Sequence, residues 1–190
     1  MGSNKSPAVI YVSSSAIMSA VEAHRSSGYL TYAVTNGGTL KNPPTSNTEL
    51  ATPVKAGYTF DGWYESADFS GNAVTAAPTA GTTYYAKWTM IKNISLRSDA
   101  KDAVVTYGTP VTLTTAPTSS QWTYTWYKDA NNVLDTTKDT EIGKGGNTLV
   151  LNNVSDSGTY WVVASDGENN NATSNKVCLL YTSDAADDKA

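Results

Sequence analysis

Residues 149–165, LVLNNVSDSGTYWVVAS, contain two short β-type segments separated by a turn. Leu149 and Leu151 alternate with other residues, and an aromatic and β-branched run begins after Gly158. Such alternation is typical of half-buried strands, and the Asn, Ser, Asp and Gly residues between the segments are typical of turns. We therefore predict two strands joined by a tight connection.

Further strands are predicted at 111–113 (VTL) and 122–128 (WTYTWYK), and the two strands above extend over 147–154 and 158–165. Short alternating strands separated by turn residues are typical of a β-sandwich. Long helix-forming stretches are missing, whereas Thr, Ser, Asn, Gly and Tyr are abundant, which favours strands. The predicted fold class is mainly β.

In this order the four segments resemble strands B, C, E and F of an immunoglobulin-like domain over residues 94–177. The stretch from Leu149 to Tyr160 resembles the passage that ends in a tyrosine corner, and Trp126 matches the buried tryptophan of strand C. The two usual cysteine positions fall at Thr115 and Val162, so the sandwich is expected to lack the inter-sheet disulfide. The core is then expected to rest on Leu113, Trp126, Leu151, Tyr160 and Val162. The resemblance implies a bacterial surface protein, where sandwiches without cysteine are common.

An aromatic and glycine pattern marks residues 29–89. TNGGT at 35–39 predicts a tight turn, because Asn-Gly tolerates positive φ, and GYTFDGWY and TTYYAKW predict two strands. Trp63 and Trp88 are interpreted as core rather than as a sugar platform, since few other large apolar residues are available here. The pattern resembles a Listeria–Bacteroides repeat of internalin-type surface proteins. That family implies a small β-grasp-like module on exported bacterial proteins.

The remaining segments lie outside these two modules. Residues 1–28 predict a short strand and a helix, interpreted as a remnant of a preceding region, and residues 90–93 form a short linker. Residues 178–190 include Cys178, the single cysteine of the chain. CLLYTSDAAD also resembles a translated sequencing adapter, so residues 178–188 are hypothesised to be read-through; the same residues encoded in adapter-free genomic sequence would contradict this. LLYT is nevertheless apolar enough to complete a sheet edge.

Strand alternation gives one candidate binding surface. If Trp126 and Tyr160 point inward, Tyr127 and Trp161 point outward from neighbouring strands and form an exposed aromatic patch. The functional interpretation is a contact site for a protein or a glycan. The alternative is a cross-strand aromatic pair that only stiffens the sheet.

No catalytic, cofactor or metal site is predicted. The chain has one histidine, His24, and one cysteine, too few for a zinc cluster or a Cys–His nucleophile. The carboxylates sit in predicted turns (Asp61, Glu65, Asp68, Asp129, Asp135 and Asp156). Residues 129–133 lack the oxygen ligand and glycine of an EF-hand loop, whereas irregular calcium coordination at 166–169 stays open beside a plain turn. Gly143–Gly146 lacks the Ser or Thr of a phosphate loop, and the sequons at Asn93, Asn153 and Asn171 matter only in a eukaryotic secretory pathway.

The net charge of −4 without a basic cluster disfavours nucleic-acid binding, and no apolar run is long enough to insert in a membrane. We expect a non-catalytic fragment of a bacterial cell-surface or secreted multidomain protein that acts as a spacer, display or adhesion module. Its signal peptide and anchor are expected outside residues 1–190. The expected partner is a host or neighbouring-cell surface protein or glycan. Two alternatives stay open: an accessory module of an exported polysaccharide or cell-wall hydrolase, and a glycan-binding module.

Overall fold

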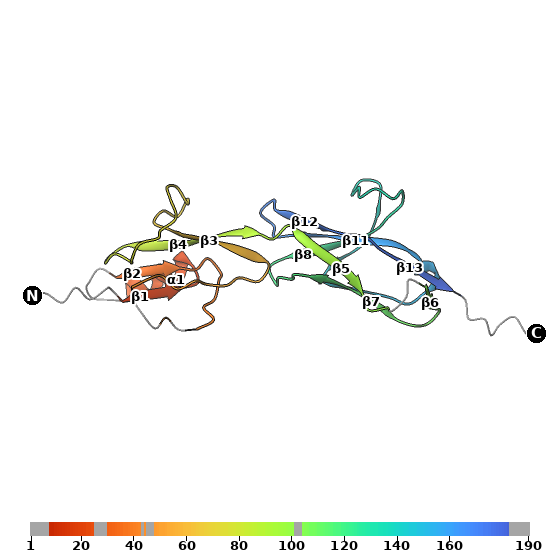
Figure 1. Ribbon diagram of the computed structural model, residues 1–190, viewed down its shortest axis with the longest axis horizontal. Coiled ribbons are helices and arrows are strands. Elements are labelled where there is room, and N and C mark those ends of the chain that lie inside the picture. The colour runs from red at the N-terminus through yellow and green to blue at the C-terminus, as the bar shows by residue number, and fades with distance from the viewer. Residues whose placement is uncertain (1–7, 25–29, 43, 45–47, 101–103, 183–190) are drawn as a thin grey trace, which may run out of the picture. The chain divides into compact units, whose positions relative to one another are not determined.

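The computed structural model describes residues 8–24, 30–42, 44, 48–100 and 104–182. The chain divides into two compact units, residues 1–90 and 91–190, and the division falls within the expected linker at 90–93. Both units consist mainly of strands, as predicted (Figure 1).

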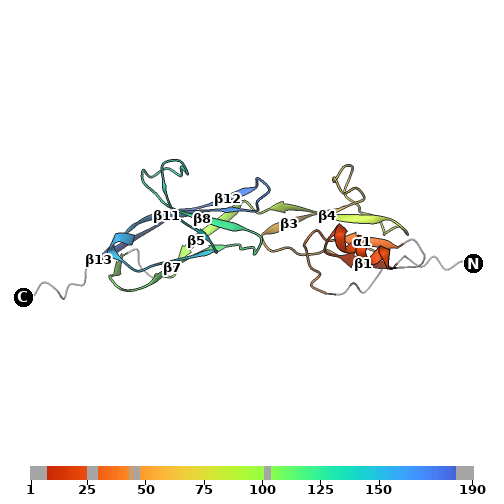
Figure 2. The same ribbon diagram turned by 180° about the vertical axis from the view of Figure 1, so that it is seen from behind.

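The first unit contains a four-stranded mixed sheet with the order β1-β2-β4-β3. β1 (Val9–Val12) is parallel to β2 (Thr31–Val34), which is parallel to β4 (Thr83–Met90), and β3 (Tyr58–Tyr64) is antiparallel to β4. A parallel pair requires a crossover, and α1 (Ser15–Ala23) lies between β1 and β2 in the chain; Figure 2 shows it beside β1. The two strands predicted from the repeat pattern, GYTFDGWY and TTYYAKW, correspond to β3 and β4.

β1 belongs to this sheet and α1 packs against it, so residues 9–23 are not a remnant of a preceding region, and that interpretation is wrong for them. The predicted strand and helix are both present, and the Ser14 hydroxyl caps α1 by accepting from the Ile17 N–H at 3.3 Å. β1 pairs with β2 from Val9–Thr31 to Val12–Val34. The sequence pattern of each segment gave its type, but not its pairing with a strand some twenty residues away. Residues 1–7 and 25–28 lie outside the described part of the chain.

Each face of the sheet carries its own core. On one face Val12, Tyr32 and Val34 are buried, and Met18 and Val21 of α1 pack against them. On the other face the buried residues are Ala33, Trp63, Tyr84 and Ala86, with Phe60 and Trp88 packed against them. The prediction of Trp63 as core is confirmed, and Trp88 lies at the half-buried rim of the same cluster.

The turn at residues 35–39 adopts the predicted positive φ, 48° at Asn36 and 84° at Gly37. Gly38 packs directly on Trp88: a Cβ at this position would lie 2.5 Å from the indole ring. The Trp88 indole in turn donates to the Thr35 carbonyl oxygen at 2.9 Å. Glycine at 38 therefore permits the ring to close over the turn.

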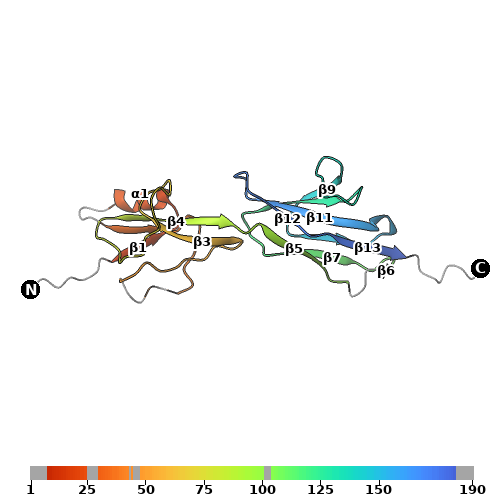
Figure 3. The ribbon, with the colours of Figure 1, turned by 45° about the horizontal axis from the view of Figure 1, so that its top comes forward.

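The second unit is a sandwich of two layers (Figure 3). One layer contains β10 (Thr148–Leu151), β7 (Val111–Ala116) and β5 (Asn93–Ser98), all antiparallel. The other contains β9 (Thr140–Gly145), β8 (Thr123–Lys128) and β11 (Gly158–Ser165), followed by β12 (Asn171–Ser174), β13 (Val177–Thr182) and β6 (Val104–Thr106). β5 also pairs in parallel with β12.

This pairing is that of an immunoglobulin-like sandwich. β7, β8, β10 and β11 take the places of strands B, C, E and F, and β12 with β13 form a last strand interrupted at Asn175 and Lys176. The predicted core residues Leu113, Trp126 and Tyr160 are at most 2% exposed. Thr115 and Val162 are buried where a disulfide usually stands.

The tyrosine corner is present. The Tyr160 hydroxyl donates to the backbone oxygen of Asp156, which lies in the short 3-10 turn η1 (Val154–Asp156) before β11. Burial raises the pKa of Tyr160 to about 12. Residues 178–182 complete β13, as their apolar pattern predicts, and Leu179 and Tyr181 are buried. Cys178 is an exposed free thiol, and residues 183–190 lie outside the described part.

Candidate functional site

Tyr127 and Trp161 are brought together as strand alternation predicts. They lie directly opposite each other on β8 and β11, and their rings stack with centroids 4.6 Å apart and an interplanar angle of 20°. Trp126 and Val162 form the adjacent opposite pair, which belongs to the core between the layers. Tyr127 and Trp161 therefore occupy the outer face of the sheet, as expected.

The expected exposure of this pair is wrong. Tyr127 is 8% exposed and Trp161 is 2% exposed, so neither ring is accessible to a partner. Asp139, at the end of the connection between β8 and β9 (residues 129–139), is buried as well and accepts a hydrogen bond from the Trp161 indole at 2.9 Å. The arrangement matches the alternative interpretation, a cross-strand pair that stiffens the sheet.

Asp139 is buried, and its carboxylate has three donors. Besides the indole of Trp161, the backbone N–H groups of Ala130 at 3.0 Å and Asp135 at 3.3 Å donate to it. These bonds join both ends of the 129–139 connection to the outer face of the sheet. The sequence did not single out Asp139, because its role depends on the conformation of the connection and not on a motif.

A second anchor lies at the other end of the connection. The Lys176 ammonium donates to Asp129 and, at 3.3 Å, to Asn132. Asp129 also accepts from the N–H groups of Asn131 and Asn132, at 3.0 and 2.7 Å. The Lys176 hydrogen bond holds the pKa of Asp129 below its usual range. The Asp129 carboxylate, a calcium ligand if residues 129–133 were an EF-hand loop, is thus bound to an ammonium group instead.

Three other candidate carboxylates, Asp68, Asp135 and Asp156, are hydrogen-bonded within their own turns. Ser66 and the Ser70 backbone donate to Asp68, and lower its pKa to about 2. Asp135 accepts from Thr137, and its pKa is lowered. Although burial opposes it, the pKa of Asp156 is lowered by the N–H groups of Asn152 and Asn153. Asp61 lies on β3 and not in a turn, so that prediction is wrong, and it accepts from the Thr89 hydroxyl of β4 at 2.5 Å.

The turn between β11 and β12 is held by Asp166. Its carboxylate accepts from the N–H groups of Glu168 at 2.8 Å and Asn170 at 3.3 Å, and from the Asn170 amide at 2.9 Å. These are the bonds of a plain turn, the alternative to calcium coordination at 166–169. No group of three His, Cys, Asp or Glu side chains that would hold a metal is found among the described residues.

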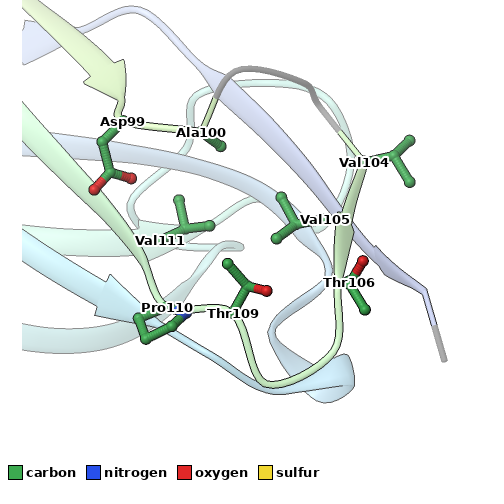
Figure 4. Close-up of a pocket in the computed structure, with 8 residues that line it drawn as sticks. All are labelled: Asp99, Ala100, Val104, Val105, Thr106, Thr109, Pro110 and Val111. Carbon is green, nitrogen blue, oxygen red and sulfur yellow. The ribbon is translucent and has the colours of Figure 1, made fainter. Parts of the chain in front are cut away.

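Among the described residues, hollows also lie outside the Tyr127–Trp161 site. In one, of about 370 Å³, Val105 and Val111 point inward, whereas Val104 points away (Figure 4). Its carboxylate, Asp99, accepts from the Thr112 N–H at 2.8 Å. Another is an open hollow on α1 beside Ile17 and His24. Nδ1 of His24 lies 2.8 Å from the Ala20 carbonyl oxygen within the same helix.

No helix in the described residues is long and apolar enough to span a membrane. The strand pairing described above defines a mainly β protein whose second unit is an immunoglobulin-like sandwich. Residues 29–87 match the Listeria–Bacteroides repeat domain, a repeat typical of bacterial surface proteins. The family resemblance of the first unit is thereby confirmed.

Comparison with curated proteins gave no match. Among solved structures, the chain is similar to murine CEACAM1b at 18% identity and a TM-score of 0.36, over 57% of this chain and 53% of that chain. The similarity thus spans about half of that structure. Because the TM-score is low, the sandwich is assigned from its own strand pairing and not from this similarity.

Proposed function

We propose that this chain is a non-catalytic part of a bacterial cell-surface or secreted protein, in which it spaces, displays or adheres. The observation that carries the proposal is the match of residues 29–87 to the Listeria–Bacteroides repeat domain. Fold alone does not assign a function, but this repeat is typical of bacterial surface proteins.

The use of the polar side chains supports a structural role. The aspartates of the second unit that face its turns accept hydrogen bonds from nearby donors, and Asp139 and Asp129 hold the connection over the sheet. A catalytic carboxylate needs a pKa near the working pH, whereas the pKa values of Asp68, Asp129 and Asp135 are lowered. These groups are suited to rigidity rather than to proton transfer.

Rigidity is what a spacer or display module requires. The stacked Tyr127–Trp161 pair, the two anchors of the 129–139 connection and the tyrosine corner all restrict the second unit. Tyr127 and Trp161 do not offer a contact site for a glycan or a protein, because both rings are buried.

The proposal is tested by replacing residues 8–182 in the parent gene with an unrelated pair of β-sandwich modules of similar length. A spacer predicts that surface display and cell adhesion survive the replacement, and an adhesion module predicts that display survives while adhesion is lost. Loss of an enzymatic activity from the cell surface with display intact would contradict the non-catalytic role.

A further inference from the structure

β9 is an edge strand with an open side. Within the described residues it pairs with β8 alone, and its residues are exposed or half-exposed (Figure 3). The unpaired N–H and C=O groups of such an edge are a template for another strand. Proteins that avoid edge pairing place lysine or a bulge there, and β9 has both.

The bulge arranges the charges of β9 in a particular way. Ile142 is the extra residue: Glu141 lies opposite Tyr127, Gly143 opposite Trp126, and Lys144 opposite Thr125. Tyr127 and Thr125 are two residues apart on β8 and share a face, so Glu141 and Lys144 also share a face. Without the bulge, side chains three positions apart would lie on opposite faces.

The Glu141 and Lys144 side chains can exchange their ion pair within the chain for ion pairs with another molecule. They form an ion pair of 3.6 Å with each other, and are 46% and 61% exposed. An ion pair this exposed contributes little to stability. Exchange for equivalent partners on another molecule therefore costs little.

Gly143 directly follows the extra residue of the bulge. Its φ is not positive, and a Cβ at this position would meet no atom within 4 Å. Neither backbone conformation nor packing inside the chain therefore requires glycine. Glycine within a strand weakens it, and often marks a bulge, as here, or a place where another backbone approaches closely.

We propose that a second copy of this chain pairs with β9 in antiparallel orientation, about a twofold axis between residues 142 and 143. This register places Glu141 opposite Lys144 of the second copy, and Lys144 opposite its Glu141, on one face of the joined sheet. Ile142 falls opposite Gly143 of the second copy, where a side chain is missing. The lysine that would repel an identical edge is matched by the glutamate. The proposal goes beyond the proposed function and does not depend on it.

The test is sedimentation velocity of the full chain over a concentration series, at low ionic strength and with a reductant that keeps Cys178 from forming disulfides. The wild type is expected to associate reversibly. Glu141→Lys and Lys144→Glu each turn two attractive cross-strand pairs into two repulsive ones, so each is expected to raise the dissociation constant about tenfold or more. An equimolar mixture of the two variants, and the double exchange in one chain, restore opposite charges and association.

The matched controls carry the same charge changes away from β9. Lys138→Glu lies in the 129–139 connection and Glu168→Lys in the β11–β12 turn, and both are expected to leave association unchanged. Association of the mixed variants also shows that each variant is folded. A wild type that stays monomeric at every soluble concentration, single variants that associate as strongly as the wild type, or a mixture no stronger than its components would each overturn the proposal.

Discussion

The indole N–H of Trp161 donates to the carboxylate of Asp139 at 2.9 Å, and both residues are buried. This bond joins β11 to the end of the 129–139 connection, at a point where the Trp161 ring stacks on Tyr127. Because both rings are buried, this aromatic pair at outward-facing positions is not a binding patch.

Replacement of Asp139 by alanine tests this arrangement. The change leaves the Trp161 indole and two backbone N–H groups without their acceptor, so we expect the second unit to lose about 2–3 kcal/mol of unfolding free energy. Hydrogen exchange of β8 and β11 amides localises the loss to this unit. Asp61→Ala, at an exposed carboxylate in the first unit, is the control; equal protection of these amides in Asp139→Ala and wild type would contradict the role of the bond.

The tyrosine corner gives a pH-dependent prediction. Because the pKa of Tyr160 is raised from 10 to about 12 in the folded state, its contribution is complete below pH 10 and is lost as the pH rises from 10 toward 12. Tyr160→Phe removes the hydrogen bond to Asp156 and is expected to cost about 1–2 kcal/mol at neutral pH. Its unfolding free energy should then fall less steeply above pH 10. A parallel decline in variant and wild type would argue against this titration, and Tyr107→Phe, at an exposed tyrosine, is the matched control.

The Lys176–Asp129 contact is tested by carboxylate titration. Lys176→Met removes the donor that lowers the pKa of Asp129, so the pKa should rise toward the usual aspartate range while that of Asp135 stays in place. Lys138→Met should do the reverse. Carbon-13 NMR of the side-chain carboxyl groups measures both. Since the pKa is lowered in the folded state, the stabilisation is present above the unfolded pKa of Asp129 and disappears as the pH falls through the folded value.

Gly38 provides a prediction for the first unit. In Gly38→Ala the new methyl group meets the Trp88 ring, and the ring must move away from the turn that its indole holds. We expect a loss of about 1–3 kcal/mol in the unfolding free energy of this unit, typical of overpacking. Gly146→Ala is the control, because a Cβ there meets no atom within 4 Å and its φ is not positive. Equal melting temperatures of the two variants would mean that the Trp88 ring moves aside without loss of stability, which would contradict this prediction.

Much of the fold follows from local patterns in the sequence. Period-two alternation located β7, β8, β10 and β11, and it placed Trp126 and Tyr127 on opposite faces correctly. Alternation tells which face a side chain takes but not what covers that face. The bonds that Asp139 accepts from Trp161 and Asp129 accepts from Lys176 are long-range, and no sequence motif indicates either of them.

The same limit explains why residues 9–23 were wrongly interpreted as a remnant of a preceding region. Their apolar run and serine cap indicated a strand and a helix, but the parallel pairing of Val9 with Thr31 depends on tertiary packing. The bulge at Ile142 was likewise not visible in the sequence, and it is this bulge that brings Glu141 and Lys144 to one face.

The central claim, that this chain belongs to a protein at the outside of a bacterial cell, is tested most directly by antibody labelling of intact source cells. Antibodies raised against the folded chain are applied before and after permeabilisation, beside an antibody to a cytoplasmic protein. We predict that intact cells are labelled as strongly as permeabilised ones, or that the antigen is found in the culture medium. Labelling that appears only after permeabilisation, together with the cytoplasmic control, would contradict the claim.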